Sequence, residues 1–368
     1  MPANIICRDC REPYPEHGAP YRCPVCGGFF DFDGPFSIDP GQVEPNLPGL
    51  WRYRHAFSLF PGAPVVSLGE GLTPLVWEEF AGQPVGLKME SLNPTGSYKD
   101  RGSAVLVSQL TARGVQQALE DSSGNAGASF AAYAARARIR ARIFVPEAAS
   151  GPKRIQIESY GAELVRVPGP RSAAAQAVLE EVGQGQVYAS HAYMPFGLAG
   201  IASLAYELWE ELGRAPGTII APTGHGGLLR GTILGFEALL QAGVIDRAPY
   251  YVGVQAAACA PIAAAFQHGL AAVETVEEGA TVAEGVRVRR PSQVEALLKA
   301  MPPGKGEFLA IEEEAILPAA RELGQRGFYV EPTSALAWCA LQQVAGRVPE
   351  PVVAVLTGTG LKYLPSSS

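Results

Sequence analysis

The chain has 368 residues, of which 47% are hydrophobic and 18% are charged, and its mean hydropathy is +0.08. This length predicts about two globular domains, and the composition excludes a mainly disordered chain. The net charge of −7 disfavours a nucleic-acid surface, which needs clustered lysine and arginine. No apolar run approaches the roughly 18 residues of a spanning helix, and the first residues resemble no signal peptide. We therefore expect a soluble, cytoplasmic protein without nucleic-acid or membrane partners.

Four of the six cysteines lie within the first 26 residues, as two Cys-x2-Cys pairs separated by twelve residues. The pairs are Cys7 with Cys10 and Cys23 with Cys26. Each pair places two thiolates on one tight turn, and four thiolates complete a tetrahedral zinc site. Disulfides are the alternative, and they are disfavoured in a chain without an export signal. The spacing therefore predicts a structural zinc in a ribbon-like knuckle over residues 1–34.

The pattern after the knuckle indicates an α/β fold. Residues 31–50 are rich in proline, glycine and aspartate and predict a linker. From about Val65, short β-branched runs alternate with stretches rich in alanine and leucine. Strands are expected at Ile139–Val145, Glu163–Val167, Thr218–Ala221, Tyr251–Gln255, Phe308–Ile311 and Val352–Leu356, and helices at Ala126–Arg138, Ile201–Leu212, Leu228–Gln241 and Ser334–Val344. Such alternation predicts open, mainly parallel sheets whose ligands bind in the loops after the strands.

The first of these loops is NPTGSYKDRG at residues 93–102, which contains Lys99. Proline and glycine fix a tight turn, and a helix is expected from about Ser103. A lysine at such a turn is a candidate for forming a Schiff base, for which a neutral amine is needed. An ordinary solvated lysine at a helix start is the alternative.

Three further loops offer anion-binding groups. Asp121–Gly127 (DSSGNAG) enters an alanine-rich helix, and its hydroxyls and free N–H groups suit a carboxylate, although plain N-capping is the alternative. Pro222–Gly227 (PTGHGG) has three glycines in four residues, which lets the backbone approach a phosphate closely. Leu356–Lys362 (LTGTGLK) places hydroxyls at the end of the last strand, where a plain terminal turn is the alternative.

In their order along the chain, these four loops resemble those of fold-type II pyridoxal-phosphate enzymes, and most closely those of the threonine synthase family. The resemblance covers residues 59–363, includes EPTSA at 331–335, and extends to the cysteine knuckles that some threonine synthases carry. Two departures stand out. Tyr98 replaces the commoner phenylalanine, and the glycine turn departs from Gly-Asn-x-Gly-Asn at His225 and Leu228.

The resemblance implies roles for individual residues. Lys99 would form the Schiff base with pyridoxal phosphate and shuttle protons, and Asn125 would bind the 3′-oxygen of the cofactor. Ser122, Ser123 and Ala126 would bind the substrate carboxylate. The cofactor phosphate would be held by Gly224, His225, Gly226 and Gly227. Thr357 would face the pyridine nitrogen, and a hydroxyl there moderates the electron sink because it does not force ring protonation.

The resemblance also implies two domains around a cofactor cleft. Residues 35–101 and 200–368 would form a large cofactor-binding domain, and residues 102–199 a small mobile substrate domain. A homodimer is expected on the same ground. The substrate would be a small amino acid.

The implied activity is that of a threonine synthase-like lyase acting on phosphohomoserine. A serine/threonine dehydratase or a β-replacement synthase of the cysteate or cysteine type is the alternative. Threonine synthases bind the substrate phosphate partly through Asn, Arg and Lys, and here Met194, Gly197 and Ala202 stand at those positions. We expect an apolar wall at Met194–Phe196 that suits a less polar side chain, with charge supplied, if at all, by Lys88, Arg101, Lys153, Arg154 or the 287–290 cluster.

Overall fold

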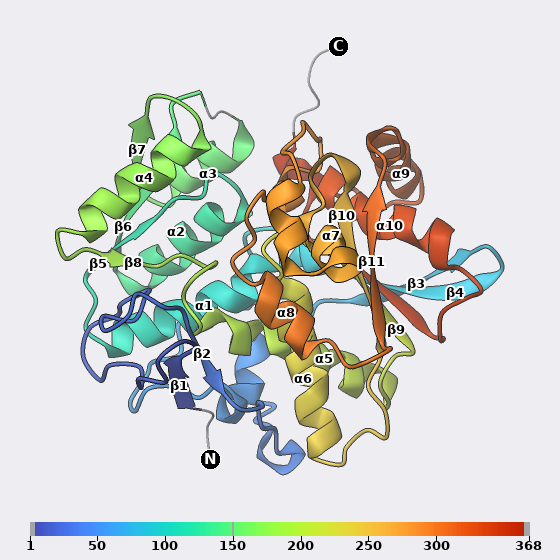
Figure 1. The fold of residues 1–368 in the computed structure, drawn as a ribbon. Helices are drawn as coiled ribbons and strands as arrows, with labels where there is room; N and C mark the ends of the chain where they lie inside the picture. The colour runs from blue at the N-terminus through green and yellow to red at the C-terminus, as the bar shows by residue number, and fades with distance from the viewer. Residues whose placement is uncertain (1–3, 149–150, 364–368) are drawn as a thin grey trace. The chain divides into compact units, whose positions relative to one another are not determined.

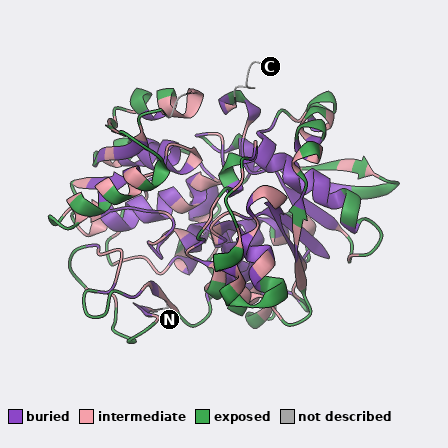
Figure 2. Ribbon diagram, turned by 45° about the horizontal axis from the view of Figure 1, so that its top comes forward, coloured by how far each residue is buried: buried purple, intermediate pink, exposed green. Residues whose placement is uncertain are grey.

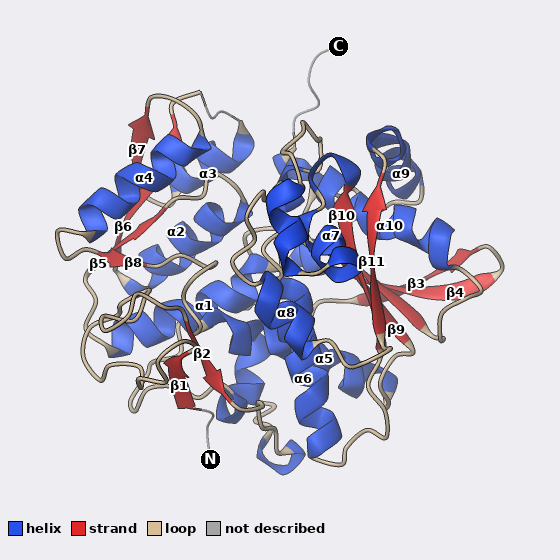
Figure 3. Ribbon diagram, viewed as in Figure 1, coloured by secondary structure: helices blue, strands red, loops and turns tan. Residues whose placement is uncertain are grey.

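The computed structural model describes residues 4–148 and 151–363. The chain divides into two compact units. The first comprises the described residues up to Gly71 together with Lys99–Gly200, and the second comprises Leu72–Tyr98 and Ile201–Tyr363. Figure 1 follows the chain through both units by colour, and Figure 3 separates helices from strands. The structure confirms the predicted α/β architecture with parallel-sheet domains.

The first unit is built around a four-stranded parallel sheet of order β7-β6-β5-β8. Its strands are β5 (Gln117–Glu120), β6 (Arg140–Pro146), β7 (Glu163–Val167) and β8 (Val187–Tyr188), and its helices are α1 (Lys99–Ala112), α2 (Asn125–Ala137), α3 (Pro152–Ser159) and α4 (Arg171–Val182). α4 packs on the sheet through Ala174 and Val178, which contact Leu119 and Phe144. α2 packs on β6 and also contacts α1 and α3.

The N-terminal segment of the first unit forms a two-stranded antiparallel sheet, β1 (Asn4–Cys7) with β2 (Phe30–Asp33). The predicted linker over residues 31–50 is wrong as a description of this segment. Phe36, Ile38 and Leu50 are buried, because removing their apolar surface from water is favourable, while the polar residues around them stay exposed. The segment is therefore packed into the first unit.

The second unit contains a six-stranded sheet of order β11-β10-β9-β12-β4-β3, in which only the β3–β4 pair is antiparallel. Its strands are β3 (Leu75–Phe80), β4 (Gln83–Lys88), β9 (Thr218–Pro222), β10 (Tyr250–Ala256), β11 (Gly306–Ile311) and β12 (Val352–Val355). Its helices are α6 (Gly227–Gln241), α7 (Pro261–His268), α8 (Val294–Ala300), α9 (Glu313–Gln325) and α10 (Pro332–Val344), and α5 (Gly197–Leu212) enters it from the first unit.

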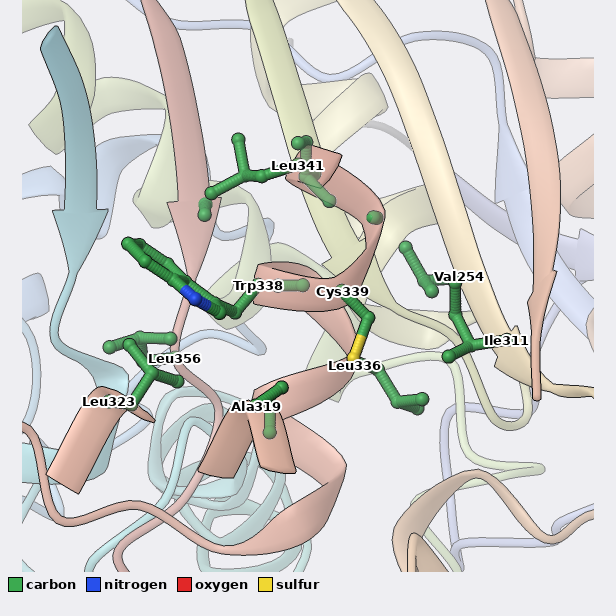
Figure 4. Packing of buried hydrophobic residues seen from close by; sticks show 14 of the residues in the cluster. Val254, Ile311, Ala319, Leu323, Leu336, Trp338, Cys339, Leu341 and Leu356 are labelled. Atoms are coloured by element: carbon green, nitrogen blue, oxygen red, sulfur yellow. The ribbon is translucent and has the colours of Figure 1, made fainter. Parts of the chain in front are cut away.

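Helices cover both faces of this sheet. Side chains alternate between the two faces of a strand. Val254 on β10 belongs to the core beneath α10, which also contains Trp338 and Leu336, as Figure 4 shows. Gly253, the preceding residue, faces the other side, where a Cβ would lie 3.1 Å from Leu229 of α6. Burial on both faces explains why β9, β10 and β12 are nearly continuous apolar runs, and Figure 2 shows the buried residues in purple.

The predicted strands and helices are confirmed as elements, with small differences at their ends. The helix expected from about Ser103 begins earlier, at Lys99, so the lysine is the first residue of α1. The units divide the chain differently from the expected domains. Residues 35–71 and Lys99 belong to the first unit, whereas we expected them in the large domain together with residues 200–368. No helix within the described parts of the chain is long and apolar enough to span a membrane.

Candidate active site

Three of the predicted loops follow three neighbouring strands of the second unit. The sheet places β4, β12 and β9 side by side and parallel. The chain that leaves β4 leads to the turn at residues 93–98, β12 leads to Thr357, and β9 leads to the glycine turn. Since the carboxyl ends of parallel strands meet at one edge, the three loops emerge together.

The turn before Lys99 is tied to the loop that carries Thr357. The Tyr98 N–H donates to the Thr357 carbonyl at 3.0 Å, and the Thr359 N–H donates to the Gly96 carbonyl at 3.0 Å. The Lys362 amine donates to the Thr95 carbonyl at 2.5 Å. These bonds fix the backbone that enters Lys99.

Ser334, in the EPTSA segment, positions the Thr357 hydroxyl. Its Oγ lies 3.0 Å from the Thr357 Oγ1 and accepts the Gly358 N–H at 2.9 Å. Both side chains are buried. No role was predicted for Ser334, because a serine in a helix start carries no signal of its partner 23 residues away. The only signal in the sequence for a role of Ser334 was the EPTSA motif in which it lies.

The glycine turn forms the N-terminal end of α6. Gly226 is left-handed, with φ +97°, and no side chain caps the helix. A Cβ on Gly224 would lie 2.7 Å from the Gly285 carbonyl oxygen, so this position requires glycine. A Cβ on Gly227 would meet nothing within 4 Å. Open space at an uncapped helix N-terminus fits a phosphate, which such N–H groups and the helix dipole bind.

The first unit contains Lys99, the predicted carboxylate-binding residues Ser122, Ser123 and Ala126, and Asn125, which was predicted to bind the 3′-oxygen of the cofactor. The loop ends at Gly124, the uncapped N-cap residue of α2, whose N–H donates to the Ser122 Oγ at 3.2 Å. α1, which begins at Lys99, packs against α2, and the Ser129 hydroxyl donates to the Asp100 carboxylate at 2.6 Å. An uncapped helix N-terminus flanked by hydroxyls suits a carboxylate.

Gly127 fixes the shape of this loop. A Cβ there would lie 1.8 Å from the Ser122 carbonyl oxygen, a distance that no side chain tolerates. The loop therefore folds back tightly over the first turn of α2. Glycine is needed here for close approach rather than for a positive φ.

The four N-terminal cysteines converge in the first unit. Their Sγ atoms all lie within 4.8 Å of one another, and the Cys7–Cys26 and Cys10–Cys26 separations are both 3.4 Å. Four thiolates around zinc at about 2.3 Å would be about 3.8 Å apart. The Gly28 N–H also donates to the Cys26 Sγ. The donor set and its spacing fit a tetrahedral zinc.

The apolar segment at 193–196 has a different role from the one predicted. Met194 and Phe196 are buried, and both contact Tyr14 of the N-terminal segment. Tyr193 stacks on Phe29, with ring centroids 5.5 Å apart. The expectation of an apolar substrate wall is therefore wrong for these side chains. They are apolar because the cysteine knuckle packs on them.

Arg113 of the segment after α1 joins the same contact. Its guanidinium donates to the carbonyls of Pro15, Glu16 and Gly18 at 2.7, 3.2 and 3.0 Å. It also lies over the Tyr14 ring, 4.8 Å from the centroid. Charge-assisted bonds and a cation–π contact thus attach the knuckle to the rest of the first unit.

Several cations that could have bound a substrate phosphate already have partners. Lys88 is fully buried and pairs with Glu211 at 2.8 Å and Glu207 at 3.3 Å. In the basic cluster, Arg287 pairs with Glu278, Arg290 pairs with Glu274, and Arg289 donates to the carbonyls of Val273 and Glu274. These cations are therefore already paired within the second unit.

The fold and these loops define a class of α/β enzymes that bind a phosphorylated cofactor at the carboxyl edge of a parallel sheet. Residues 66–358 match the family of pyridoxal-phosphate-dependent enzymes, and the chain belongs to that family. It is 30% identical to a threonine synthase of Methanocaldococcus jannaschii, over 97% of this chain and 92% of that protein. It is 33% identical to a threonine synthase of Mycobacterium tuberculosis, over 89% and 92%. The protein is thus a threonine synthase-like, pyridoxal-phosphate-dependent lyase.

Solved structures agree with this fold. The T.th. threonine deaminase matches with a TM-score of 0.66 and 26% identity, over 80% of this chain and 94% of that chain. A maize serine racemase matches with a TM-score of 0.69 and 19% identity, over 80% and 90%. The second likeness concerns the fold alone.

Proposed function

We propose that the protein is a threonine synthase, which converts phosphohomoserine and water to threonine and phosphate. The similarity to threonine synthases over nearly the whole chain supports this reaction. The observation that carries the proposal is the common edge of β4, β12 and β9, from which the lysine turn, Thr357 and the glycine turn all emerge.

Lys99 and the glycine turn would bind the cofactor, and Lys99 would also transfer protons. Pyridoxal phosphate, when bound, supplies an electron sink that stabilises negative charge beside the amino group of the substrate. Lys99 would hold the cofactor covalently through Nζ, and Nζ would take and return protons of the substrate. Gly224, His225, Gly226 and Gly227 would hold the cofactor phosphate, with backbone N–H groups as donors.

The remaining residues would orient the reactants. Thr357 would face the ring nitrogen, held by Ser334, and a hydroxyl there leaves that nitrogen uncharged more often than a carboxylate would. Asn125 would bind the 3′-oxygen. Ser122, Ser123 and Ala126 would bind the substrate carboxylate, and closure of the 102–199 domain would exclude water.

The cysteine knuckle is proposed to hold one structural zinc through Cys7, Cys10, Cys23 and Cys26. The clustering of the four Sγ atoms supports this assignment. The metal would stabilise the folded knuckle and take no part in the reaction. We further propose that the enzyme is a cytoplasmic homodimer and that it does not bind nucleic acid.

Purified full-length protein loaded with pyridoxal phosphate tests this function. It should form threonine and release phosphate from phosphohomoserine, and Lys99→Ala should abolish both. Lys299→Ala is the matched control, because Lys299 is an exposed lysine whose ion pair with Glu295 lies on the surface of α8. Deamination of serine or threonine without any threonine formation would overturn the proposal.

A further inference from the structure

A buried carboxyl group lies beside the proposed carboxylate-binding loop. Glu120 is the last residue of β5 and only 1% exposed, and it directly precedes the loop that begins at Asp121. Its Oε1 lies 3.1 Å from the Nδ1 of His191. Among the described residues, its Oε2 has no hydrogen-bond partner.

Glu120 and His191 come from one edge of the same sheet. β5 and β8 are neighbours and parallel, and His191 lies three residues after the end of β8. Figure 1 shows the two strands side by side. The imidazole is 26% exposed, so it connects the buried carboxyl to the surface of this edge. The two residues are 71 positions apart in the chain, which explains why no pattern in the sequence indicates the pair.

The surroundings of Glu120 favour its protonated form, but nearby cations also stabilise its ionised form. Burial and the neighbouring Asp121 raise its pKa well above the usual glutamate value. Lys99 and Arg171 act in the opposite direction and stabilise the carboxylate. Tyr188 donates to Asp121 at 2.8 Å and so holds that second carboxylate in place. A buried acid whose two forms are both supported by neighbours can exchange a proton.

We propose that Glu120 and His191 form a proton relay beside Lys99, in which His191 gives a proton to the oxygen that leaves the substrate side chain. This inference rests on the proposed role of Lys99 and deepens the proposed function. His191 is the proton-transferring residue, and Glu120 is the positioning residue that orients and reprotonates it. Such a relay would speed the reaction most when the leaving oxygen needs a proton to depart.

The proton count closes over one turnover. The Glu120 carboxylic acid donates to Nδ1, so the neutral imidazole carries its own proton on Nε2. As the carbon–oxygen bond breaks, its electron pair stays on the leaving oxygen, which takes the Nε2 proton, and the Glu120 proton moves to Nδ1. When water adds to the substrate in threonine formation, its released proton returns to Nε2, and the Nδ1 proton returns to Glu120. In serine deamination no water adds to the side chain, and solvent at the exposed edge of the imidazole restores the Nε2 proton instead.

Leaving-group dependence separates this relay from a structural role. Serine and β-chloroalanine share one carbon skeleton, but hydroxide needs a proton on departure and chloride does not. In Glu120→Gln, the amide can still donate to Nδ1 but has no proton to transfer. We expect Glu120→Gln and His191→Gln to slow serine turnover roughly 100-fold, with β-chloroalanine turnover little changed. His268→Gln, at the exposed end of α7, is the control.

Equal losses on both substrates, or no loss on either, would overturn the relay. The visible absorbance of lysine-bound cofactor should persist in Glu120→Gln and His191→Gln and vanish in Lys99→Ala. A wild-type protein that never binds the cofactor would instead refute the proposed function. In that case, nitrogen-15 NMR of labelled histidines still tests the Glu120–His191 relay, because it shows which ring nitrogen of His191 carries the proton. The relay predicts that neutral His191 carries its proton on Nε2, and a proton on Nδ1 that Glu120→Ala leaves unchanged would contradict it.

Discussion

Gly127→Ala tests whether the loop at residues 122–124 binds substrate. The added Cβ would lie 1.8 Å from the Ser122 carbonyl oxygen, whereas real Cβ contacts are essentially never shorter than 3.0 Å. The loop must therefore shift by more than 1 Å. A displacement of this size in a positioning element can lower activity roughly 100-fold. We expect a loss of about that size in kcat/KM for threonine formation, together with about 1–3 kcal/mol of overpacking strain.

Gly124→Ala is the matched control for this loop. Its Cβ would make an ordinary contact, 3.7 Å from the Ser122 Oγ, and the residue has φ −102°, which alanine adopts without strain. The assay compares kcat/KM of both variants with phosphohomoserine, after the visible absorbance has shown equal cofactor loading. If Gly127→Ala turned over substrate as fast as Gly124→Ala, the loop would not be the carboxylate-binding element.

Three further predictions concern the knuckle, the buried acid and the substrate. Native protein should contain about one zinc per chain, and Cys7→Ser with Cys10→Ser should release it without changing the cofactor absorbance, at a cost of up to about 10 kcal/mol in knuckle folding; metal-free native protein under reducing conditions would refute the site. Because the pKa of Glu120 is raised in the folded state, the folded protein binds this proton more tightly than the unfolded one, and stability falls as pH rises above the usual value of 4.5. The free energy of unfolding of Glu120→Gln should therefore increase relative to wild type between pH 4.5 and 8, and parallel pH profiles would contradict this. Phosphohomoserine should bind weakly, with a KM well above the micromolar range, since each missing charge-assisted donor at positions 194, 197 and 202 forfeits about 1.5–3 kcal/mol; efficient turnover at micromolar substrate would show that other cations supply the charge.

The six strands that the sequence predicted in the two sheets are confirmed, because strands buried on both faces are continuous apolar runs, whereas β3, β4, β5 and β8 were not predicted. Thr218–Ala221 and Val352–Leu356 are such runs, and both are confirmed as strands, with end differences of one residue. The tight turns were also located from the sequence, since proline and glycine mark turns directly after the apolar strands. The order of apolar runs and turn residues along the chain was therefore sufficient to place these strands and turns.

Contacts between distant segments could not be predicted in this way. The aromatic contact between Tyr14 and Phe196 joins residues 182 positions apart. It shows that the apolar side chains of residues 193–196 pack against the knuckle, whereas the sequence had suggested that they line the substrate site. Phe36 and Ile38 carried too weak a pattern to reveal that the supposed linker is packed. The Glu120–His191 pair likewise depends on the adjacency of β5 and β8, which sequence spacing does not specify.

Borohydride reduction followed by peptide mapping tests most directly whether Lys99 holds the cofactor. Reduction makes the lysine–cofactor bond permanent, and mass spectrometry of the digest then identifies the modified residue. The chain has six lysines, at positions 88, 99, 153, 299, 305 and 362. We expect a pyridoxyl group on the peptide that contains Lys99 and on no other. Modification of a different lysine, or of none in protein saturated with pyridoxal phosphate, would contradict it.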